Sequence, residues 1–238
     1  MGSSKFDNTE MDEETLNMVK NIFNIERMKI CMSEHSLDLD KLPIGLLTID
    51  KIKRCHLILC EIQRILVTTQ ANTKQNLIIS LTNDFYVTIP HNFGMKKPPI
   101  LDHLMRVKEK TRMLEQLQDI YTMQQIFLQS MKFDLKQRDP YEALHNELCV
   151  QLTRLPRDND YFQAINQAIY NTQAATHRSQ IDIAVKDIYE IRKPSEKLRF
   201  FPFEKKIHNK FLLWHGFRTQ CVASILRNGI RLPHADSA

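Results

Sequence analysis

A histidine–glycine pair near the C-terminal end has the residue types best suited to binding a polar ligand. His215 and Gly216 follow the continuous apolar run 211–214, which predicts a central strand buried on both faces. A strand that ends there exposes its last side chain at the sheet edge, and glycine lets a ligand approach the bare backbone. The helix expected to start at Thr219 would offer unpaired N–H groups to an anionic or carbonyl oxygen.

The side chains around this pair suggest which ligand groups they would meet. His215 is suited to donate a hydrogen bond to a sugar hydroxyl, and Arg218 or Arg231 to bind a phosphate. The residues alone leave other interpretations open: a structural histidine at a strand end, Trp214 in the core, and Arg231 as a solvated charge. The spacing therefore indicates a polar ligand pocket without identifying its ligand.

Composition limits the class of protein. The 238 residues are 42% hydrophobic and 26% charged, which is typical of a globular chain with one or two domains. No stretch approaches the roughly 18 uncharged apolar residues that span a bilayer, so we expect no membrane partner. The net charge is +5 and there is no basic run, so direct DNA or RNA binding has little support from the sequence.

Cysteine and histidine usage predicts a reducing compartment and no metal. The five cysteines include no C-x-x-C pair, and the nine histidines lack zinc-ligand spacing to one another or to the cysteines. Free thiols of this kind are typical of intracellular proteins. The cysteines are Cys31, Cys55, Cys60, Cys149 and Cys221.

The first half of the chain, from about residue 12 to 133, has helical apolar spacing. We expect a first helix whose positive N-terminal end carries Asp12, a second from Thr48 or Asp50, a short third over 73–82 and a long fourth over 101–130. Three prolines and a glycine predict a loop over 89–99. The predicted buried residues are Leu16, Val19, Ile22, Phe23 and Ile30, then Ile52, Cys55, Leu59, Ile62 and Leu66, then Leu114, Leu117, Tyr121 and Phe127.

The second half, after a boundary at 133–141, changes to strand-like spacing. Leu148, Val150 and Leu152 alternate as in a half-buried strand, and Asp160 is expected to cap a helix that ends near 173. A second strand pair or one bent strand follows, over Ile181, Ile183, Val185, Ile188 and Ile191. The short helix from Thr219 should turn Val222, Ala223 and Leu226 inward and end at a left-handed Gly229.

Several longer segments carry a family resemblance. Residues 40–47 (DKLPIGLL), 89–99 (IPHNFGMKKPP), 175–177 (ATH), 187–189 (DIY) and 208–216 (HNKFLLWHG) resemble the catalytic region of the nuclear, DNA-damage-responsive poly(ADP-ribose) polymerases. The similarity runs in family order from about residue 12 to the end. It implies an α + α/β fold: an all-α helical-bundle regulatory domain (12–135) and a truncated, mixed-sheet ADP-ribosyltransferase domain (139–238). The preceding residues 1–11 are expected to be a disordered N-terminus. The resemblance also implies a nuclear location.

The resemblance implies transfer of ADP-ribose from NAD, as substrate, to protein acceptors, with no metal. His215 would then hydrogen-bond the adenine-side ribose, Gly216 would pair its backbone with the nicotinamide carboxamide, and Arg231 would lie near the adenosine end. Phe217 stands where the family has Ser or Thr, so one hydrogen bond to the carboxamide is lost. Cys221 replaces a family asparagine, and Ser224 occupies a position near the ligand.

No catalytic residue is assigned in this chain. By the resemblance, the family's nicotinamide-stacking tyrosine and catalytic glutamate fall beyond Ala238, so we expect this polypeptide to be inactive alone and residues 139–238 to be poorly stable alone. Partners linked to DNA damage would be engaged through N-terminal domains that this chain lacks. The alternative is an inactive, truncated family member that acts as a protein-interaction or regulatory module.

Overall fold

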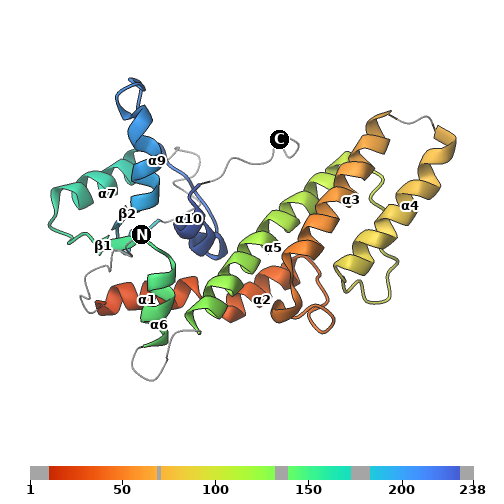
Figure 1. Cartoon of the computed structure of the whole chain (residues 1–238), viewed down its shortest axis with the longest axis horizontal. Coiled ribbons are helices and arrows are strands. Elements are labelled where there is room, and N and C mark those ends of the chain that lie inside the picture. The colour runs from red at the N-terminus through yellow and green to blue at the C-terminus, as the bar shows by residue number, and fades with distance from the viewer. Residues whose placement is uncertain (1–10, 69–70, 132–138, 173–182, 231–238) are drawn as a thin grey trace. The chain divides into compact units, whose positions relative to one another are not determined.

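The computed structural model describes residues 11–68, 71–131, 139–172 and 183–230 (Figure 1). The chain divides into two compact units. The sheet unit contains Met1–Asn17 and Cys149–Leu212, and the helical unit contains Met18–Leu148 and Leu213–Ala238. Most of the predicted disordered segment, residues 1–10, lies outside the described residues.

The helical unit is organised around its longest helix, α5 (Leu104–Ser130). Helix α3 (Ile49–Thr68) packs against both α5 and α4 (Ala71–Thr88), and α5 also contacts α6, η2 and α10. These helices account for the bundle predicted from the sequence. The remaining elements of this unit are α2 (Ile25–Glu34), η1 (Ile44–Leu46), α6 (Pro140–Glu147), η2 (Thr219–Cys221) and α10 (Val222–Asn228). Helix α1 (Glu13–Ile22) spans the boundary at Asn17.

The bundle core confirms most of the predicted apolar faces. Helix α3 buries Ile52, Cys55, Leu59 and Ile62 as predicted, because residues three and four apart share one side of a helix. Helix α5 buries Leu114 and Leu117, but the exposed Phe127 lies beside the buried stripe that passes through Ile126. The buried residues of α5 are Val107, Met113, Leu114, Leu117, Ile120, Met123, Ile126 and Ser130.

The predicted first helix is two helices. The chain breaks after α1, and Asn24 caps α2 by accepting a hydrogen bond from the Arg27 N–H at 3.1 Å. The break resets the helical phase, so Ile30, predicted to be buried, is 58% exposed. The short third helix is also longer than predicted: α4 runs to Thr88, and the fully buried Phe85 in its last turns gives that extension tertiary support.

The proline-containing loop over 89–99 is confirmed, and its backbone is ordered by contacts to a distant segment. His91 forms an antiparallel bridge with Leu37, and the Asn92 N–H donates to the Ser36 carbonyl at 2.7 Å. The His91 ring stacks on Phe93, with ring centroids 5.5 Å apart and planes 9° apart. These contacts join the loop to the turn that follows α2.

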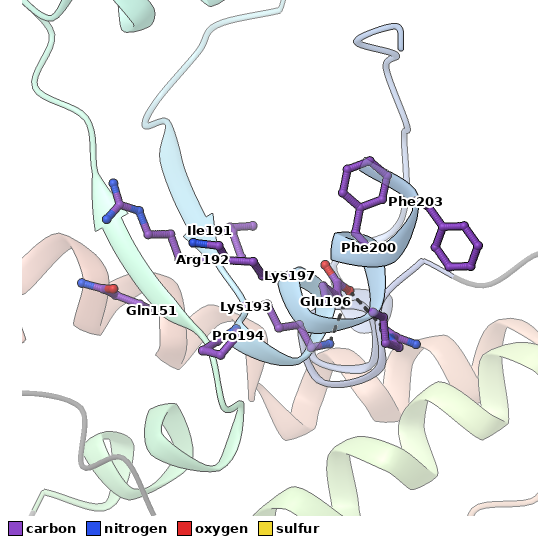
Figure 2. Close-up of a pocket in the computed structure, with 10 residues that line it drawn as sticks. Gln151, Ile191, Arg192, Lys193, Pro194, Glu196, Lys197, Phe200 and Phe203 are labelled. Carbon is purple, nitrogen blue, oxygen red and sulfur yellow. Dashed lines mark ion pairs between the residues drawn. The ribbon is translucent and has the colours of Figure 1, made fainter. Parts of the chain in front are cut away.

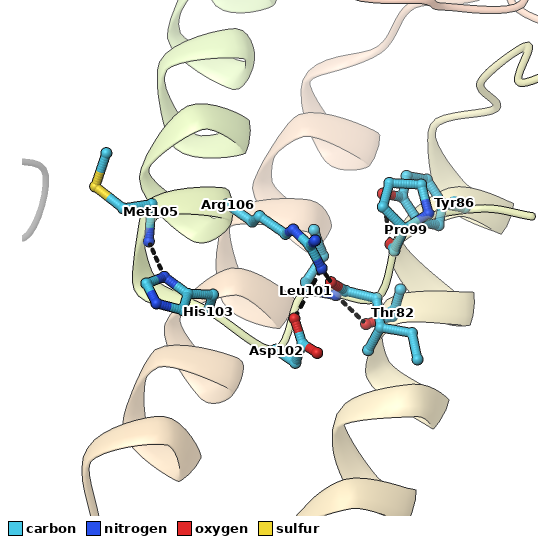
Figure 3. A network of polar contacts seen from close by, with 9 residues as sticks. Thr82, Tyr86, Pro99, Leu101, Asp102, His103, Met105 and Arg106 are labelled. Carbon is cyan, nitrogen blue, oxygen red and sulfur yellow. Dashed lines mark hydrogen bonds and ion pairs between the residues drawn. The ribbon is translucent and has the colours of Figure 1, made fainter.

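A polar network fixes the end of this loop where it enters α5 (Figure 3). The Tyr86 hydroxyl donates to the Pro99 carbonyl at 3.0 Å, and the Leu101 N–H donates to Thr82 Oγ1 at 3.1 Å. Arg106 then pairs with Asp102 at 2.9 Å. Because Thr82 and Leu101 are both buried, their hydrogen bond satisfies polar groups that water cannot reach.

The sheet unit contains an antiparallel strand pair, β1 (Gln151–Arg154) and β2 (Tyr189–Arg192), with Gln151 opposite Arg192. It also contains α7 (Asp160–Thr172), capped by Asn159 rather than by Asp160, and α9 (Pro194–Glu204). The strand predicted from Leu148 begins later, because Leu148 ends α6, a helix that the sequence did not predict. Residues 183–188 are not in a strand, and Ile181 lies outside the described residues.

The prediction of a buried central strand over 211–214 is wrong. These residues have no regular secondary structure, and Leu212 and Leu213 are 95% and 81% exposed. A strand is stabilised by hydrogen bonds to neighbouring strands, and within the described part of the chain no strand pairs with this run. Its apolar side chains therefore have no sheet face to cover.

Candidate functional site

The segment that follows the histidine–glycine pair is held on the helical unit by an arginine clamp. The Arg227 guanidinium on α10 donates to the Glu147 backbone carbonyl and pairs with the Glu147 carboxylate at 3.1 Å. Its second nitrogen donates to Gln129 Oε1 at 2.9 Å. These charge-assisted hydrogen bonds are partly buried, so they bind α10 to the ends of α5 and α6 more firmly than surface pairs would.

The start of the same segment contacts α2. Arg218 pairs with Glu34 at 3.1 Å on the exposed surface, and Gln220 donates to the Cys31 sulfur at 3.3 Å. The Cys31 thiol in turn donates to Gln116 Oε1 at 3.4 Å. Together these contacts position η2 between α2 and α5.

The two cysteines at this contact are not poised for nucleophilic chemistry. Burial is the main cause that raises the pKa of the Cys31 thiol. Burial, followed by the nearby Asp119 carboxylate, raises the pKa of Cys221 to about 12. Both therefore remain protonated at neutral pH, and a thiol reacts far more slowly than a thiolate.

His215, Gly216 and Phe217 lie together on an exposed stretch just before η2. The His215 and Phe217 rings have centroids 5.6 Å apart and planes tilted by 37°. A Cβ placed on Gly216 would meet no atom within 4 Å, so the backbone of this glycine is open to an approaching ligand. Phe217 is 48% exposed and presents an apolar face beside the histidine.

The other two predicted site residues are Ser224 and Arg231. Ser224 is buried on α10, with 5% of its surface exposed, and Arg231 lies outside the described residues. Gly229 ends α10 as predicted, with φ at +83° and its N–H donating to the Ile225 carbonyl at 2.7 Å. Arg227 was not among the predicted residues, although an arginine in the last turn of a helix is a recognisable C-terminal signal.

The described residues contain no cluster of three or more His, Cys, Asp or Glu side chains that could hold a metal ion. None of their helices combines the length and apolar character that a bilayer crossing requires.

Comparison with known proteins gives a family-model match for each of two parts of the chain. The model of the poly(ADP-ribose) polymerase regulatory domain matches residues 9–144, more than half of the chain. The chain belongs to the poly(ADP-ribose) polymerase family. The model of the poly(ADP-ribose) polymerase catalytic domain matches residues 159–237, which include His215 and the other candidate residues.

Individual relatives agree with this assignment. Poly [ADP-ribose] polymerase 1 of Gallus gallus is 37% identical over 215 residues, which cover 90% of this chain and 21% of the relative. Poly [ADP-ribose] polymerase of Drosophila melanogaster is 31% identical over 96% of this chain and 22% of its own length. Poly [ADP-ribose] polymerase 2 of Homo sapiens is 30% identical over 94% of this chain and 37% of its own length. The chain thus spans about a fifth to two fifths of these relatives.

The arginine clamp joins residues of the two domain matches. Helix α5 and Gln129 belong to the regulatory-domain match, whereas α10 and Arg227 belong to the catalytic-domain match. The segment that carries the candidate residues therefore packs on a helix of the regulatory part within one compact unit.

Proposed function

We propose that this chain is part of an NAD-dependent ADP-ribosyltransferase and supplies a portion of its NAD-binding site. The observation that carries the proposal is the accessible His215–Gly216 pair inside the catalytic-domain match. The names of the relatives, which describe polymerases of ADP-ribose, support the same reaction class. The substrates would be NAD and acceptor side chains of proteins, and the site of action would be the nucleus.

The proposed chemistry assigns a binding role to four of the candidate residues. Breaking the bond between nicotinamide and ribose develops positive charge on the ribose, so the enzyme must hold both ends of NAD while that charge forms. His215 would hydrogen-bond the adenine-side ribose, and the open backbone of Gly216 would pair with the nicotinamide carboxamide. Arg231 would lie near the adenosine end, and Ser224 near the ligand once it is bound.

Phe217 sets the expected strength of NAD binding. Its side chain offers no hydroxyl to the carboxamide, and its ring centroid lies 5.6 Å from that of His215. Losing one hydrogen bond costs about 0.5–1.5 kcal/mol when water can replace it. We therefore expect NAD to bind this chain more weakly than it would with a hydroxyl at this position.

We assign no catalytic acid to the 238 residues, and we propose that this polypeptide assayed alone transfers no ADP-ribose. A second function, a protein-interaction or regulatory module, is favoured by one observation. Within the helical unit, the apolar side chains of Leu213, Trp214 and Phe217 are all exposed, as at surfaces that bind a partner.

Calorimetric titration of the 238-residue chain with NAD tests the first proposal. We expect measurable binding that His215→Ala abolishes and that His208→Ala, at another exposed histidine in the same match, leaves unchanged. Folded protein that gives no heat with NAD would refute the binding proposal and leave the interaction module as the better account. Transfer of ADP-ribose by the isolated chain, followed by mass spectrometry of an acceptor protein, would contradict its proposed inactivity.

A further inference from the structure

An open hollow of 960 Å³ lies in the sheet unit, between the strand pair and α9 (Figure 2). Neither His215 nor Gly216 lines it, so it is distinct from the proposed NAD site. We call it the basic hollow. Its charged and aromatic lining consists of Arg192, Lys193, Glu196, Lys197, Arg199 and the pair Phe200 and Phe203.

The lining has a local excess of positive charge that the modest net charge of the chain conceals. Four of its residues are cations and one, Glu196, is an anion, which leaves three excess positive charges. One Glu196 oxygen is shared by Lys193, at 3.6 Å, and Arg199, at 3.8 Å. Both distances are longer than the roughly 2.7–2.9 Å of a charge-assisted hydrogen bond, so each of these two ion pairs is weak.

The cations are also placed to meet an incoming anion. The Lys193 side chain is only 6% exposed, so its positive charge is part of the wall of the hollow. Lys197 has no ion pair among the described residues. Arg192 pairs with Glu190 at 2.9 Å, but its side chain is 65% exposed, and an exposed pair of this kind is weak enough to exchange for a phosphate.

Two phenylalanine rings give the basic hollow a second kind of binding group. Phe200 and Phe203 are three residues apart on α9 and therefore occupy neighbouring positions on one side of the helix, and both are half exposed. The Lys210 ammonium lies 5.2 Å from the Phe200 ring centroid, which adds a further positive charge nearby. Exposed aromatic rings beside cations offer stacking and charge to the same ligand.

We propose that the basic hollow binds a short stretch of single-stranded nucleic acid. Phosphates would meet Arg192, Lys193 and Lys197, and unpaired bases would stack on the two phenylalanine rings. A duplex keeps its bases stacked internally and cannot use the rings, and an acidic peptide has no planar bases to place on them. The two rings and the spread of cations from β2 to α9 favour consecutive nucleotides over a single free one.

Fluorescence anisotropy with the whole chain and a labelled oligothymidylate of about eight nucleotides tests this proposal. We expect binding that weakens with salt with a log–log slope of about −2, because each phosphate contact to a single strand contributes roughly −0.7. Phe203→Ala should weaken binding about tenfold through lost stacking. Lys197→Gln should reduce the salt slope by the contribution of one contact, about 0.7.

Two matched variants control for general effects. Phe201→Ala removes a more exposed ring of the same helix that does not line the hollow, and Lys186→Gln removes an exposed cation elsewhere in the same unit. Both should leave binding and the salt slope unchanged. Thermal melts of all four variants by circular dichroism identify any that fail to fold.

Three results would overturn the proposal. Lack of binding by folded wild-type chain would do so, as would equal losses in Phe201→Ala and Phe203→Ala. Displacement of the labelled oligonucleotide by equimolar ADP would show instead that the hollow binds a free nucleotide. The proposal stands apart from the proposed NAD function, because His215→Ala is expected to abolish NAD binding and to leave binding of the oligonucleotide unchanged.

Discussion

Acidification should weaken the helical unit through one half-buried histidine, His91. Its Nδ1 lies 2.7 Å from the Ile89 carbonyl and its Nε2 lies 3.0 Å from the Lys110 ammonium. The neutral ring satisfies both contacts if Nδ1–H donates to the carbonyl and Nε2 accepts from Lys110. Protonating Nε2 would place a second positive charge against Lys110. Burial first, and Lys110 second, lower the pKa of His91 to about 4, from an ordinary value of 6.5.

The size of the effect follows from the difference in proton binding. The unfolded chain takes up a proton on His91 as the pH falls through 6.5, whereas the folded chain resists until about pH 4. The stability that His91 contributes is therefore present above its unfolded pKa and is lost as the pH falls toward its folded pKa. Between pH 7 and pH 5, these two pKa values correspond to a loss of roughly 2 kcal/mol in the free energy of unfolding.

Urea unfolding of the whole chain, followed by far-ultraviolet circular dichroism at pH 7 and pH 5, measures this loss. His91→Gln cannot titrate, so the difference between its two unfolding free energies should be smaller than that of wild type by roughly 2 kcal/mol. His145, whose pKa burial also lowers, acts in the same direction but equally in both proteins. His208→Gln, at an exposed histidine, should behave as wild type. An identical pH dependence in wild type and His91→Gln would refute the reasoning.

Three further substitutions test the segment from Phe217 to Gly229, which contains η2 and α10. Arg227→Met removes the hydrogen bonds to Glu147 and Gln129 while keeping much of the side-chain volume, and should lower the free energy of unfolding by about 1–3 kcal/mol in urea titrations; no change would show that the clamp is dispensable. Gly229→Ala forces a Cβ onto a backbone with φ at +83° and should cost about 1 kcal/mol by the same assay; a variant as stable as wild type would contradict this. Phe217→Ser restores a hydroxyl and should tighten NAD binding about two- to tenfold by calorimetry, whereas weaker binding would mean that the phenylalanine ring contacts the ligand favourably.

Short-range patterns in the sequence predicted the elements that depend on neighbouring residues. The apolar residues of α3, from Ile52 to Ile62, recur every three or four positions, so the buried face follows from helix geometry alone. The loop over 89–99 follows from its prolines, which cannot continue a helix. Gly229 ends α10 because a positive φ costs glycine little. These features are local, and so the order of residues is enough to find them.

The elements that sequence reasoning misplaced depend on partners far away in the chain. Residues 211–214 have the composition of a buried strand, but a strand also needs neighbours, and the described residues supply none. Ile30 was predicted to be buried on the face of one continuous helix. The break at Asn24 shifts the helical phase, and apolar periodicity does not reveal the size of that shift. Helix α6 was missed, because its short apolar pattern is weak and its packing against α5 supports it.

The sequence by itself determined the family, the helical bundle and the histidine–glycine pair, since each resides in a continuous run of residues. Tertiary structure decided which side chains meet. Arg227 reaches Glu147 across 80 positions and Gln129 across 98, and the basic hollow joins β1 to α9 across some 50 positions of sequence. Such contacts form only when distant elements pack, because their energy depends on burial and geometry that no local pattern encodes.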